Sequence, residues 1–335
     1  MSRPLPNHVE TFPLTGDSAV TWQYATAHPL LSRLYENAKR DQWNVTTDIA
    51  WDTPVDPDGE IISDMGIAIY GTPLWDGLDT AKRLELRRLQ LRYTLSQFMH
   101  GEQLALITAS QLVECAPDLE AKYYASTQVF DEARHVEVFA RYLATKAKAD
   151  VFPVAPLLRD IFGALIKSPE WDVKYLGVQV LLEGIALSTF HFIHDTCQEP
   201  VLRDVLGYVL KDEARHVAFG NIALRGLYAD LSPAEVETRE QVVIDVSDMM
   251  YHRLRADEMY AMAGLDPEEC RVLADQSEIM LAFRRGVFSR IVPAVKKIGL
   301  LTPRVTDYYG RLGVLEFQDN KTADEELLGA DAGTP

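Results

Sequence analysis

Several features that mark other classes of protein are scarce in this sequence. Only three of the 335 residues are cysteines, and they are widely separated without a CxxC pair. This argues against a disulfide framework or a zinc knuckle and favours a reducing, cytoplasmic setting. No run of about 18 apolar residues occurs, so we expect no membrane span. The first residues also lack the apolar core that a signal peptide needs.

Positive charge is scarce as well. The chain carries 33 Lys and Arg residues against 50 Asp and Glu residues, a formal net charge of −17. Such a balance argues against nonspecific binding to nucleic acid and against docking on an anionic membrane. Hydrophobic residues make up 47% of the chain, which is ordinary for a globular protein.

Glycine and proline are unevenly distributed, and their distribution divides the chain. Residues 1–80 are rich in Pro, Gly, Asp and Trp, which predicts an arm or cap with one short helix near 30–40. Residues 81–230 contain long stretches with apolar residues at three- and four-residue spacing, which predicts a bundle of long helices. We expect further helices over 231–318 to pack on that bundle. The acidic residues 319–335 predict a flexible tail. The predicted fold class is all-α.

An internal repeat carries the functional information. The sequence DEARHV occurs at 131–136 and again at 212–217, an offset of 81 residues. The same offset relates Glu102 to Glu183, and each of these glutamates precedes the glutamate of its ExxH motif by 30 residues. Thirty residues suit two antiparallel helices joined by a short turn. A lone glutamate and an ExxH motif are therefore expected to face each other twice.

The spacing within each motif suits a metal site. Positions i and i+3 of a helix lie about 60° apart, so both side chains can reach one ion. Glu132 with His135, and Glu213 with His216, have this spacing. An unpaired glutamate inside an apolar run, as at Glu183, would cost several kcal/mol without a cation. We therefore predict a metal site formed by Glu102, Glu132, His135, Glu183, Glu213 and His216; that it holds two ions, with the four glutamates as the catalytic carboxylates, is what the resemblance described below implies.

The remaining polar residues of each motif have a supporting role in this interpretation. Asp131 and Asp212 could each accept the free ring N–H of a ligand histidine, on the same helix or on the facing one, and so fix its tautomer. Arg134 and Arg215 could pair with those aspartates and keep them ionised.

Two lone glutamates with two ExxH motifs resemble the ferritin-like di-iron carboxylate superfamily, over about residues 82–230. The resemblance implies a four-helix bundle that binds two iron ions, or one manganese and one iron, and that uses dioxygen as a co-substrate. Within this superfamily the chain resembles the hydroxylase subunits of multicomponent monooxygenases, the small subunit of ribonucleotide reductase and the amine N-oxygenases. The chain is about twice as long as a ferritin, which argues against iron storage.

At three positions the sequence differs from residues that are typical of these families. Phe139 stands where the reductase subunit carries its radical tyrosine, which argues against radical storage. Val209 stands where the p-aminobenzoate type of N-oxygenase has an extra ligand histidine, which weakens that family without excluding N-oxygenation. Leu187 stands where multicomponent hydroxylases usually place a threonine. A stand-alone relative of those hydroxylases is the favoured interpretation.

Our hypothesis is a non-haem di-iron monooxygenase that oxygenates a small, largely apolar substrate. Residues one turn from the expected ligands would line an apolar cavity. They are Phe98, Leu106, Phe139, Leu187 and Val209, with Gln128 and Gln179 as polar orienting groups. No flavin, haem or iron–sulfur motif occurs, so electrons must come from an external donor such as a ferredoxin or a reductase.

Other outcomes stay open. Amine N-oxygenation would use the same centre, and a storage or ferroxidase role would need no substrate pocket. Desaturation of an acyl chain would need an acyl-carrier protein, for which the basic stretch from Lys82 to Arg92 offers a docking face. The apolar helices after Asp230 make a homodimer reasonable.

Overall fold

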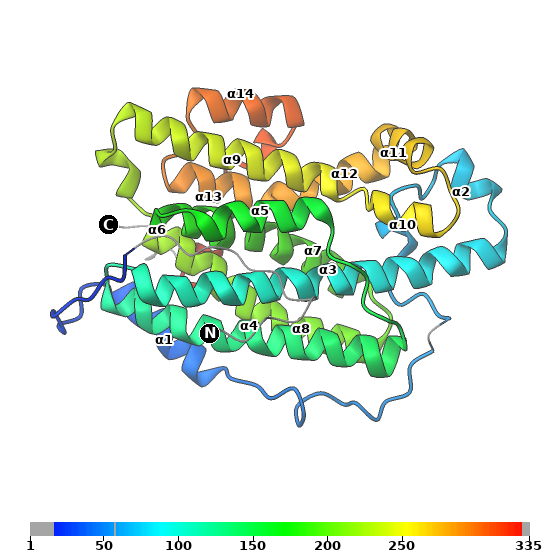
Figure 1. Cartoon of the computed structure of the whole chain (residues 1–335), viewed down its shortest axis with the longest axis horizontal. Coiled ribbons are helices and arrows are strands. Elements are labelled where there is room, and N and C mark those ends of the chain that lie inside the picture. The colour runs from blue at the N-terminus through cyan, green and yellow to red at the C-terminus, as the bar shows by residue number, and fades with distance from the viewer. Residues whose placement is uncertain (1–16, 57, 330–335) are drawn as a thin grey trace, which may run out of the picture.

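A bundle of four long helices forms the centre of the computed structural model, which describes residues 17–56 and 58–329. The first pair is α3 (Thr80–Cys115) and α4 (Leu119–Tyr142), which pack along each other as Figure 1 shows. The second pair is a helix made of α6 (Trp171–Lys174), η3 (Tyr175–Leu182) and α7 (Glu183–Thr196), followed by α8 (Pro200–Ala223). No strand occurs among the described residues, so the all-α prediction is confirmed.

The helices begin and end at residues with clear local reasons. The side chain of Asp79 accepts a hydrogen bond from the backbone N–H of Lys82 at 2.8 Å and so caps α3. Pro117 follows the end of α3, and Pro200 occupies the first turn of α8, where its missing N–H costs nothing. The carboxylate of Glu199 accepts the N–H groups of Val201 and Leu202, both at 2.7 Å.

The segment η3 is a π-helix, which nothing in the residue pattern signals. Its wider turns change the register of the helix immediately before Glu183, at the point where α7 begins. Gly177 lies in this segment, and a Cβ at that position would stand 2.2 Å from Cδ2 of Leu165. The glycine therefore lets η3 approach α5 (Pro156–Lys167) closely.

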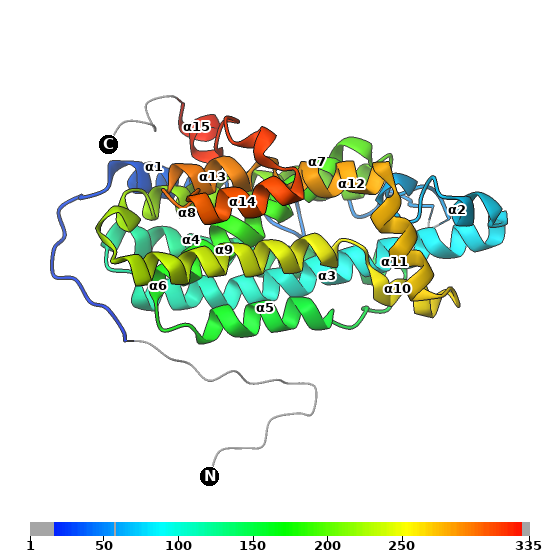
Figure 2. The ribbon, with the colours of Figure 1, turned by 90° about the horizontal axis from the view of Figure 1, so that it is seen from above.

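Further helices cover the bundle. From the N-terminal part, α1 (Pro29–Arg40) packs against α4 and α8. On another side, α9 (Pro233–Arg253) packs against η3 and α5, and runs alongside the bundle in Figure 2. The other described helical elements are η1 (Asp64–Gly66), α2 (Pro73–Gly77), η2 (Leu143–Ala147), η4 (Leu227–Asp230), α10 (Asp257–Met262), α11 (Pro267–Gln276), α12 (Glu278–Gly286), η5 (Val287–Ser289), α13 (Ile291–Lys297), α14 (Pro303–Leu312), η6 (Leu315–Phe317) and α15 (Ala323–Leu328).

One expectation for the C-terminus is wrong. Part of the stretch for which we predicted a flexible tail forms α15, which packs against α8. The reason is the buried carboxylate of Asp324, which accepts hydrogen bonds from Lys297 at 2.9 Å and from Arg225 at 2.7 Å. Residues 330–335 of that stretch, and residues 1–16 of the N-terminal arm, lie outside the described residues. The four-part division of the chain stays a prediction.

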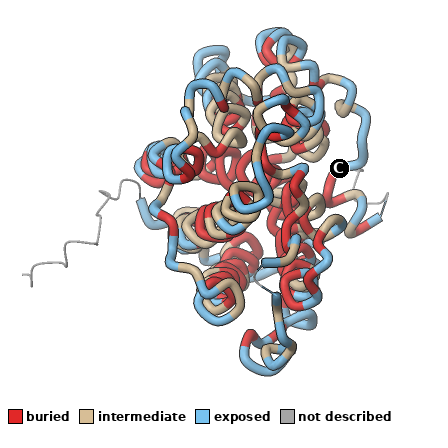
Figure 3. Tube along the Cα trace, turned by 90° about the vertical axis from the view of Figure 1, so that its right-hand side faces the viewer, coloured by how far each residue is buried: buried red, intermediate tan, exposed pale blue. Residues whose placement is uncertain are grey.

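The buried residues gather on the inward-facing parts of the helices, drawn in red in the tube of Figure 3. The helix Trp171–Thr196 is long and apolar enough to cross a membrane by length and composition, but 78% of its most apolar window is buried inside the protein. The core helix of a bundle passes the same test, so this feature is weak evidence for a span. The expected absence of a membrane span stays a prediction.

Candidate metal centre

Each of the four bundle helices brings one carboxylate to the same buried space. Glu102 comes from α3, Glu132 from α4, Glu213 from α8, and Glu183 from the first position of α7. The helix pairing that the 30-residue spacing predicted is thus the one found. All four side chains are buried, as are the two histidines of the ExxH motifs, His135 and His216.

The donor atoms fall into two overlapping groups. Glu102, Glu132, His135 and Glu213 each offer one atom, and these atoms lie within 4.8 Å of one another. Glu132, Glu183 and His216 do the same. The six side chains that the sequence singled out therefore gather at one place, and Glu132 belongs to both groups. This suits a carboxylate that bridges two ions.

The atoms in these groups approach one another closely without satisfying one another. Nδ1 of His135 lies 3.2 Å from a carboxylate oxygen of Glu102 and 3.2 Å from one of Glu213. Nδ1 of His216 lies 3.3 Å from a carboxylate oxygen of Glu132. Yet Nδ1 of His216, both oxygens of Glu213 and one oxygen each of Glu132 and Glu183 form no hydrogen bond. Converging buried lone pairs of this kind fit metal ions.

The electrostatics agree with that interpretation. Burial raises the pKa of Glu132 to about 7, and Glu102 adds to the rise while His216 opposes it. Burial also raises the pKa of Glu183 well above its usual range. For His135 and His216, burial opposes the charged ring, but the surrounding carboxylates outweigh it and raise each pKa. Without metal, the site therefore holds protons that two divalent cations would displace.

The aspartates that precede the ExxH glutamates reach across the bundle. Nε2 of His135 lies 3.1 Å from Oδ2 of Asp212, and Nε2 of His216 lies 3.3 Å from Oδ2 of Asp131. The sequence left open whether each aspartate serves its own helix or the facing one, and the structure places the contact on the facing helix. In each case Nδ1 is left to point at the glutamates.

Two buried arginines balance these aspartates. Arg134 pairs with Asp131 and lies 3.1 Å from Asp212, and Arg215 pairs with Asp212 and lies 3.8 Å from Asp131. Burial alone would raise the pKa of Asp212, but the hydrogen bond from His135 and the two guanidinium groups hold that pKa well below its usual range. Both aspartates therefore accept hydrogen bonds from buried arginine and histidine side chains.

Trp43 belongs to this network, and sequence reasoning missed it. The indole N–H of Trp43 donates to Oδ2 of Asp212 at 2.7 Å, and its ring stacks on Tyr208 with centroids 5.1 Å apart. Trp43 lies between α1 and the bundle in a segment without regular structure. A tryptophan in a loop-like stretch carries no periodic signal that links it to a motif 169 residues away.

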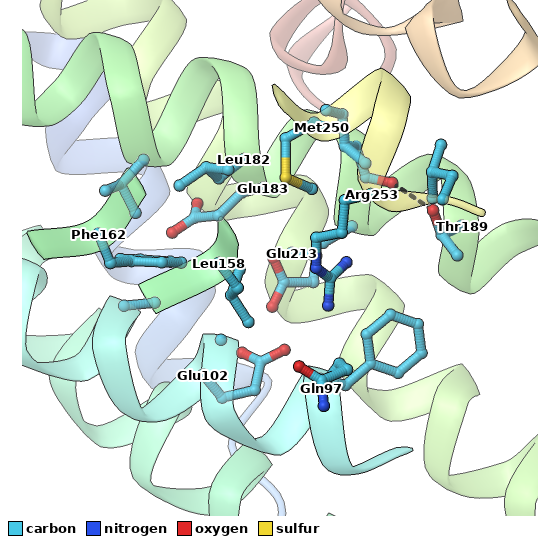
Figure 4. A pocket seen from close by; sticks show the side chains of 17 residues that line it. Gln97, Glu102, Leu158, Phe162, Leu182, Glu183, Thr189, Glu213, Met250 and Arg253 are labelled. Atoms are coloured by element: carbon cyan, nitrogen blue, oxygen red, sulfur yellow. Dashed lines mark hydrogen bonds between the residues drawn. The ribbon is translucent and has the colours of Figure 1, made fainter. Parts of the chain in front are cut away.

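A pocket opens beside the carboxylates. It encloses about 600 Å³ of non-atom space, its mouth included, and Glu102, Glu183 and Glu213 form part of its wall. Figure 4 shows that residues of α5 and α9 complete it, among them Phe162 and Met250. Apolar side chains dominate the lining, as expected for a small organic ligand.

The predicted pocket residues are mostly elsewhere. Phe98 lines the pocket, whereas Leu106, Gln128, Phe139, Gln179, Leu187 and Val209 do not. Phe139, Leu187 and Val209 belong to an apolar cluster against which Phe98 packs. Position one turn from a ligand fixes a height on the helix but does not choose between neighbouring faces, which is why these assignments were wrong.

The two glutamines also have other surroundings than those predicted. Nε2 of Gln128 donates to Glu183 at 2.7 Å and to Glu132 at 3.1 Å, so this amide holds two of the carboxylates. Gln179 is buried, and neither end of its amide forms a hydrogen bond.

The pocket residues on α5 and α9 were missed altogether. Leu158 and Phe162 of α5, Met250 and Arg253 of α9, and Leu254 directly after α9 line it; all lie outside both motif-bearing helix pairs. The amphipathic patterns of α5 and α9 predict that these helices have a buried face. They do not indicate which part of the bundle that face covers.

The chain is similar to several known proteins. The model of the p-aminobenzoate N-oxygenase AurF family matches residues 25–299. Among solved structures, dimanganese(II)-NrdF of Streptococcus sanguinis has a TM-score of 0.54 at 12% sequence identity, covering 87% of this chain and 98% of that one. A mutant R2-like ligand-binding oxidase with a reconstituted Mn/Fe cofactor has a TM-score of 0.48 at 18% identity, covering 78% and 93%. No curated protein sequence matches the chain.

Proposed function

Because the chain belongs to the p-aminobenzoate N-oxygenase AurF family, it is a non-haem di-iron oxidoreductase, and we propose that it transfers oxygen from dioxygen to the nitrogen of a small, largely apolar amine. The family match corrects one expectation. Val209 had argued against membership of this family. The match shows that the lack of a histidine at this position does not exclude the chain from the family. The preference for a relative of the multicomponent hydroxylases is likewise given up.

The observation that carries the proposal is the contact between pocket and carboxylates. Glu102, Glu183 and Glu213 are at once part of the buried donor cluster and part of the wall of the apolar pocket. A molecule in this pocket would lie against the metal-binding side chains. An iron pair, or a manganese–iron pair, would supply the reduction of dioxygen and the transfer of an oxygen atom.

The residues of the chain have distinct roles in this proposal. The four glutamates and two histidines hold the metals, with two imidazoles and four carboxylates balancing two divalent ions. Asp131 and Asp212 keep each histidine oriented through its Nε2. Gln128 steadies Glu183, and the apolar wall of the pocket excludes water from the substrate.

Electrons would come from an external donor, either a ferredoxin or a reductase. The contacts of Trp43 support one route for them. Tyr208 lines a hollow at the surface and stacks on the ring of Trp43. The indole N–H of Trp43 donates a hydrogen bond to Asp212, and Asp212 in turn contacts the ring of His135. Trp43→Phe should slow reduction by a protein donor and leave the metal content unchanged. Equal reduction rates in the two proteins would contradict this route.

The alternative reactions have less support. Carbon hydroxylation by the same centre would need only a different substrate in the pocket. Docking of an acyl-carrier protein on the basic stretch of α3 is disfavoured because Arg87 pairs with Asp64 and Arg88 with Asp58. Iron storage would show loading far above two ions per chain, and a pocket beside the donors has no role in it.

The remaining expectations about partners are also proposals. The exposed side chains of Ile107, Tyr123 and Phe130 on α3 and α4 support a homodimer, which light scattering would test. The net charge of −17 supports the absence of nucleic-acid partners. The low cysteine content supports a cytoplasmic location.

The test of the proposed function is anaerobic loading with Fe(II), metal counting, exposure to dioxygen and mass spectrometry of products from a panel of arylamines. We expect two ions per chain and nitroso or nitro products. Glu132→Ala should lose metal and turnover, while Glu137→Ala, an exposed glutamate of the same helix, should keep both. Two bound ions and full turnover in Glu132→Ala would end the assignment of the site.

A further inference from the structure

A series of cavities leads from the carboxylates toward the surface. In Figure 4 the pocket beside the donor cluster has Phe162 at one end and Thr189 at the other. A second cavity adjoins the Thr189 end and encloses about 550 Å³ of non-atom space, its mouth included. The two spaces share five lining residues, namely Gln97, Phe98, Thr189, Arg253 and Leu254. A molecule in the first pocket can therefore extend into the second cavity.

A hollow in the surface adjoins the second cavity on its outer side. Residues of η1, α7, α12 and η5 line this outer hollow, and none of its described lining residues carries a charge. It encloses about 880 Å³, its mouth included. Met65 and Ile279 lie in its wall, and they are 42% and 37% exposed. Large apolar side chains that remain exposed around a hollow mark a place where an apolar ligand can bind.

Two aromatic rings separate the second cavity from the outer hollow. Phe192 of α7 and Phe283 of α12 line both spaces, and their ring centroids lie 4.9 Å apart. Both side chains are only half-buried. Side chains with one exposed side change rotamer within nanoseconds, so the rings can part for a narrow chain. The partition therefore does not close the path to the surface.

Several polar side chains line the second cavity between these two apolar spaces. The hydroxyl of Tyr93 donates to Glu258 at 3.1 Å, and Nε2 of Gln90 donates to the hydroxyl of Thr94 at 3.0 Å. The buried carbonyl oxygen of Gln90, by contrast, accepts no hydrogen bond, and the buried Nε of Arg253 donates none. One acceptor and one donor suit a neutral amide group, whose N–H and carbonyl oxygen could satisfy both.

We propose that the substrate is an elongated amine: its amine end lies in the first pocket, a neutral amide group lies in the second cavity, and an apolar tail passes Phe192 and Phe283 into the outer hollow. This inference rests on the proposed function in one respect, namely that the first pocket holds the amine. The tail would cover Met65 and Ile279 and so remove their apolar surface from water. A route that served for entry alone would give the tail no affinity.

The test is binding by calorimetry to the Fe(II)-loaded protein without dioxygen. The probes are the N-ethyl and N-octyl derivatives of 4-aminobenzamide, which differ only in the length of the tail. Each fully buried methylene group contributes up to about fourfold in affinity. Because the hollow is open on one side, we expect the N-octyl amide to bind on the order of 10- to 100-fold more tightly than the N-ethyl amide.

Two variants that fill the outer hollow should remove most of this difference. They are Ala282→Trp, at an exposed position of α12, and Gly286→Leu, where a Cβ would meet no atom within 4 Å. The matched control is Ala234→Trp, at an exposed position of α9 that lines none of the three spaces. This control should keep the full difference. Thermal unfolding of each variant separates a filled hollow from a lost fold.

Two results would overturn the inference. One is equal affinity of the wild-type protein for the two amides, which would leave the outer hollow as a route of entry or a contact surface for another protein. The other is an undiminished difference in both Ala282→Trp and Gly286→Leu, which would place the tail elsewhere. If the two variants lose the difference but product analysis finds no N-oxygenation, the proposed function fails and the elongated site stands.

Discussion

Gly101 offers a test in which stability and activity should change in opposite directions. It lies inside α3, next to Glu102, and lines the pocket. A Cβ at this position would meet no atom within 4 Å. Glycine in a helix interior costs about 0.8–1.0 kcal/mol relative to alanine, so Gly101→Ala should raise the free energy of unfolding by about that amount. For a chain of this length the midpoint of thermal unfolding should rise by about 1–2 °C.

The added methyl group would enter the pocket. One methyl group in a binding pocket changes kcat/KM by about tenfold or more when the substrate must avoid it. We therefore expect Gly101→Ala to lower kcat/KM for any amine that the enzyme oxygenates, and Gly101→Leu to lower it further. Metal content should stay at the wild-type value, because Glu102 keeps its place on the helix.

The matched control is Gly207→Ala in α8. A Cβ there would stand 3.8 Å from Nε2 of His194, an ordinary contact, and Gly207 does not line the pocket. The Gly207→Ala variant should gain a similar free energy of unfolding without a loss of kcat/KM. Unfolding scans and product analysis measure both quantities. A fall in stability of Gly101→Ala would refute the helix argument, and an unchanged kcat/KM in Gly101→Leu would show that substrate does not occupy this pocket.

Three further predictions follow from buried charges. Asp212→Asn should weaken metal binding about 10- to 100-fold in Mn(II) titrations, because the amide holds His135 less firmly; the exposed Asp204→Asn should not. Metal-free protein should lose thermal stability between about pH 5 and pH 8, since the raised pKa values of Glu132, His135 and His216 make the folded state bind more protons than the unfolded state. Arg239→Met should lower the free energy of unfolding by about 3–5 kcal/mol, because it leaves the buried carboxylate of Asp172 without its partner.

Each of these has a result that would contradict it. Equal Mn(II) affinity of Asp212→Asn and wild type would deny the aspartate its role in orienting the histidine. A thermal stability of the metal-free protein that rises toward pH 8 would contradict the argument from bound protons. So would a dependence on pH that matches that of the Mn(II)-loaded protein. If Arg239→Met lost no more stability than Arg311→Met, whose ion pair with Asp307 is exposed, the buried pair would contribute nothing special.

The six metal-binding candidates could be read from the sequence because helical geometry is local. An i,i+3 pair such as Glu132 and His135 must share a face, whatever surrounds the helix. The repeat at 81 residues and the 30-residue spacing then paired Glu102 with one motif and Glu183 with the other. Three of these helices are regular over their motifs, so the inference from spacing to position was safe. The all-α fold followed from the same periodicity.

What lies beside those six residues was decided only by tertiary structure. Which face of each helix meets α5 and α9 depends on how the helices pack, and the π-helical η3 alters the register before Glu183 in a way that no spacing reveals. Hence Phe139, Leu187 and Val209, placed at the pocket by turn counting, pack in an apolar cluster and do not line the pocket, whereas Arg253 lines it from 37 residues beyond His216. The sequence determined the metal donors by local geometry, and packing over long distances along the chain chose what a substrate would touch.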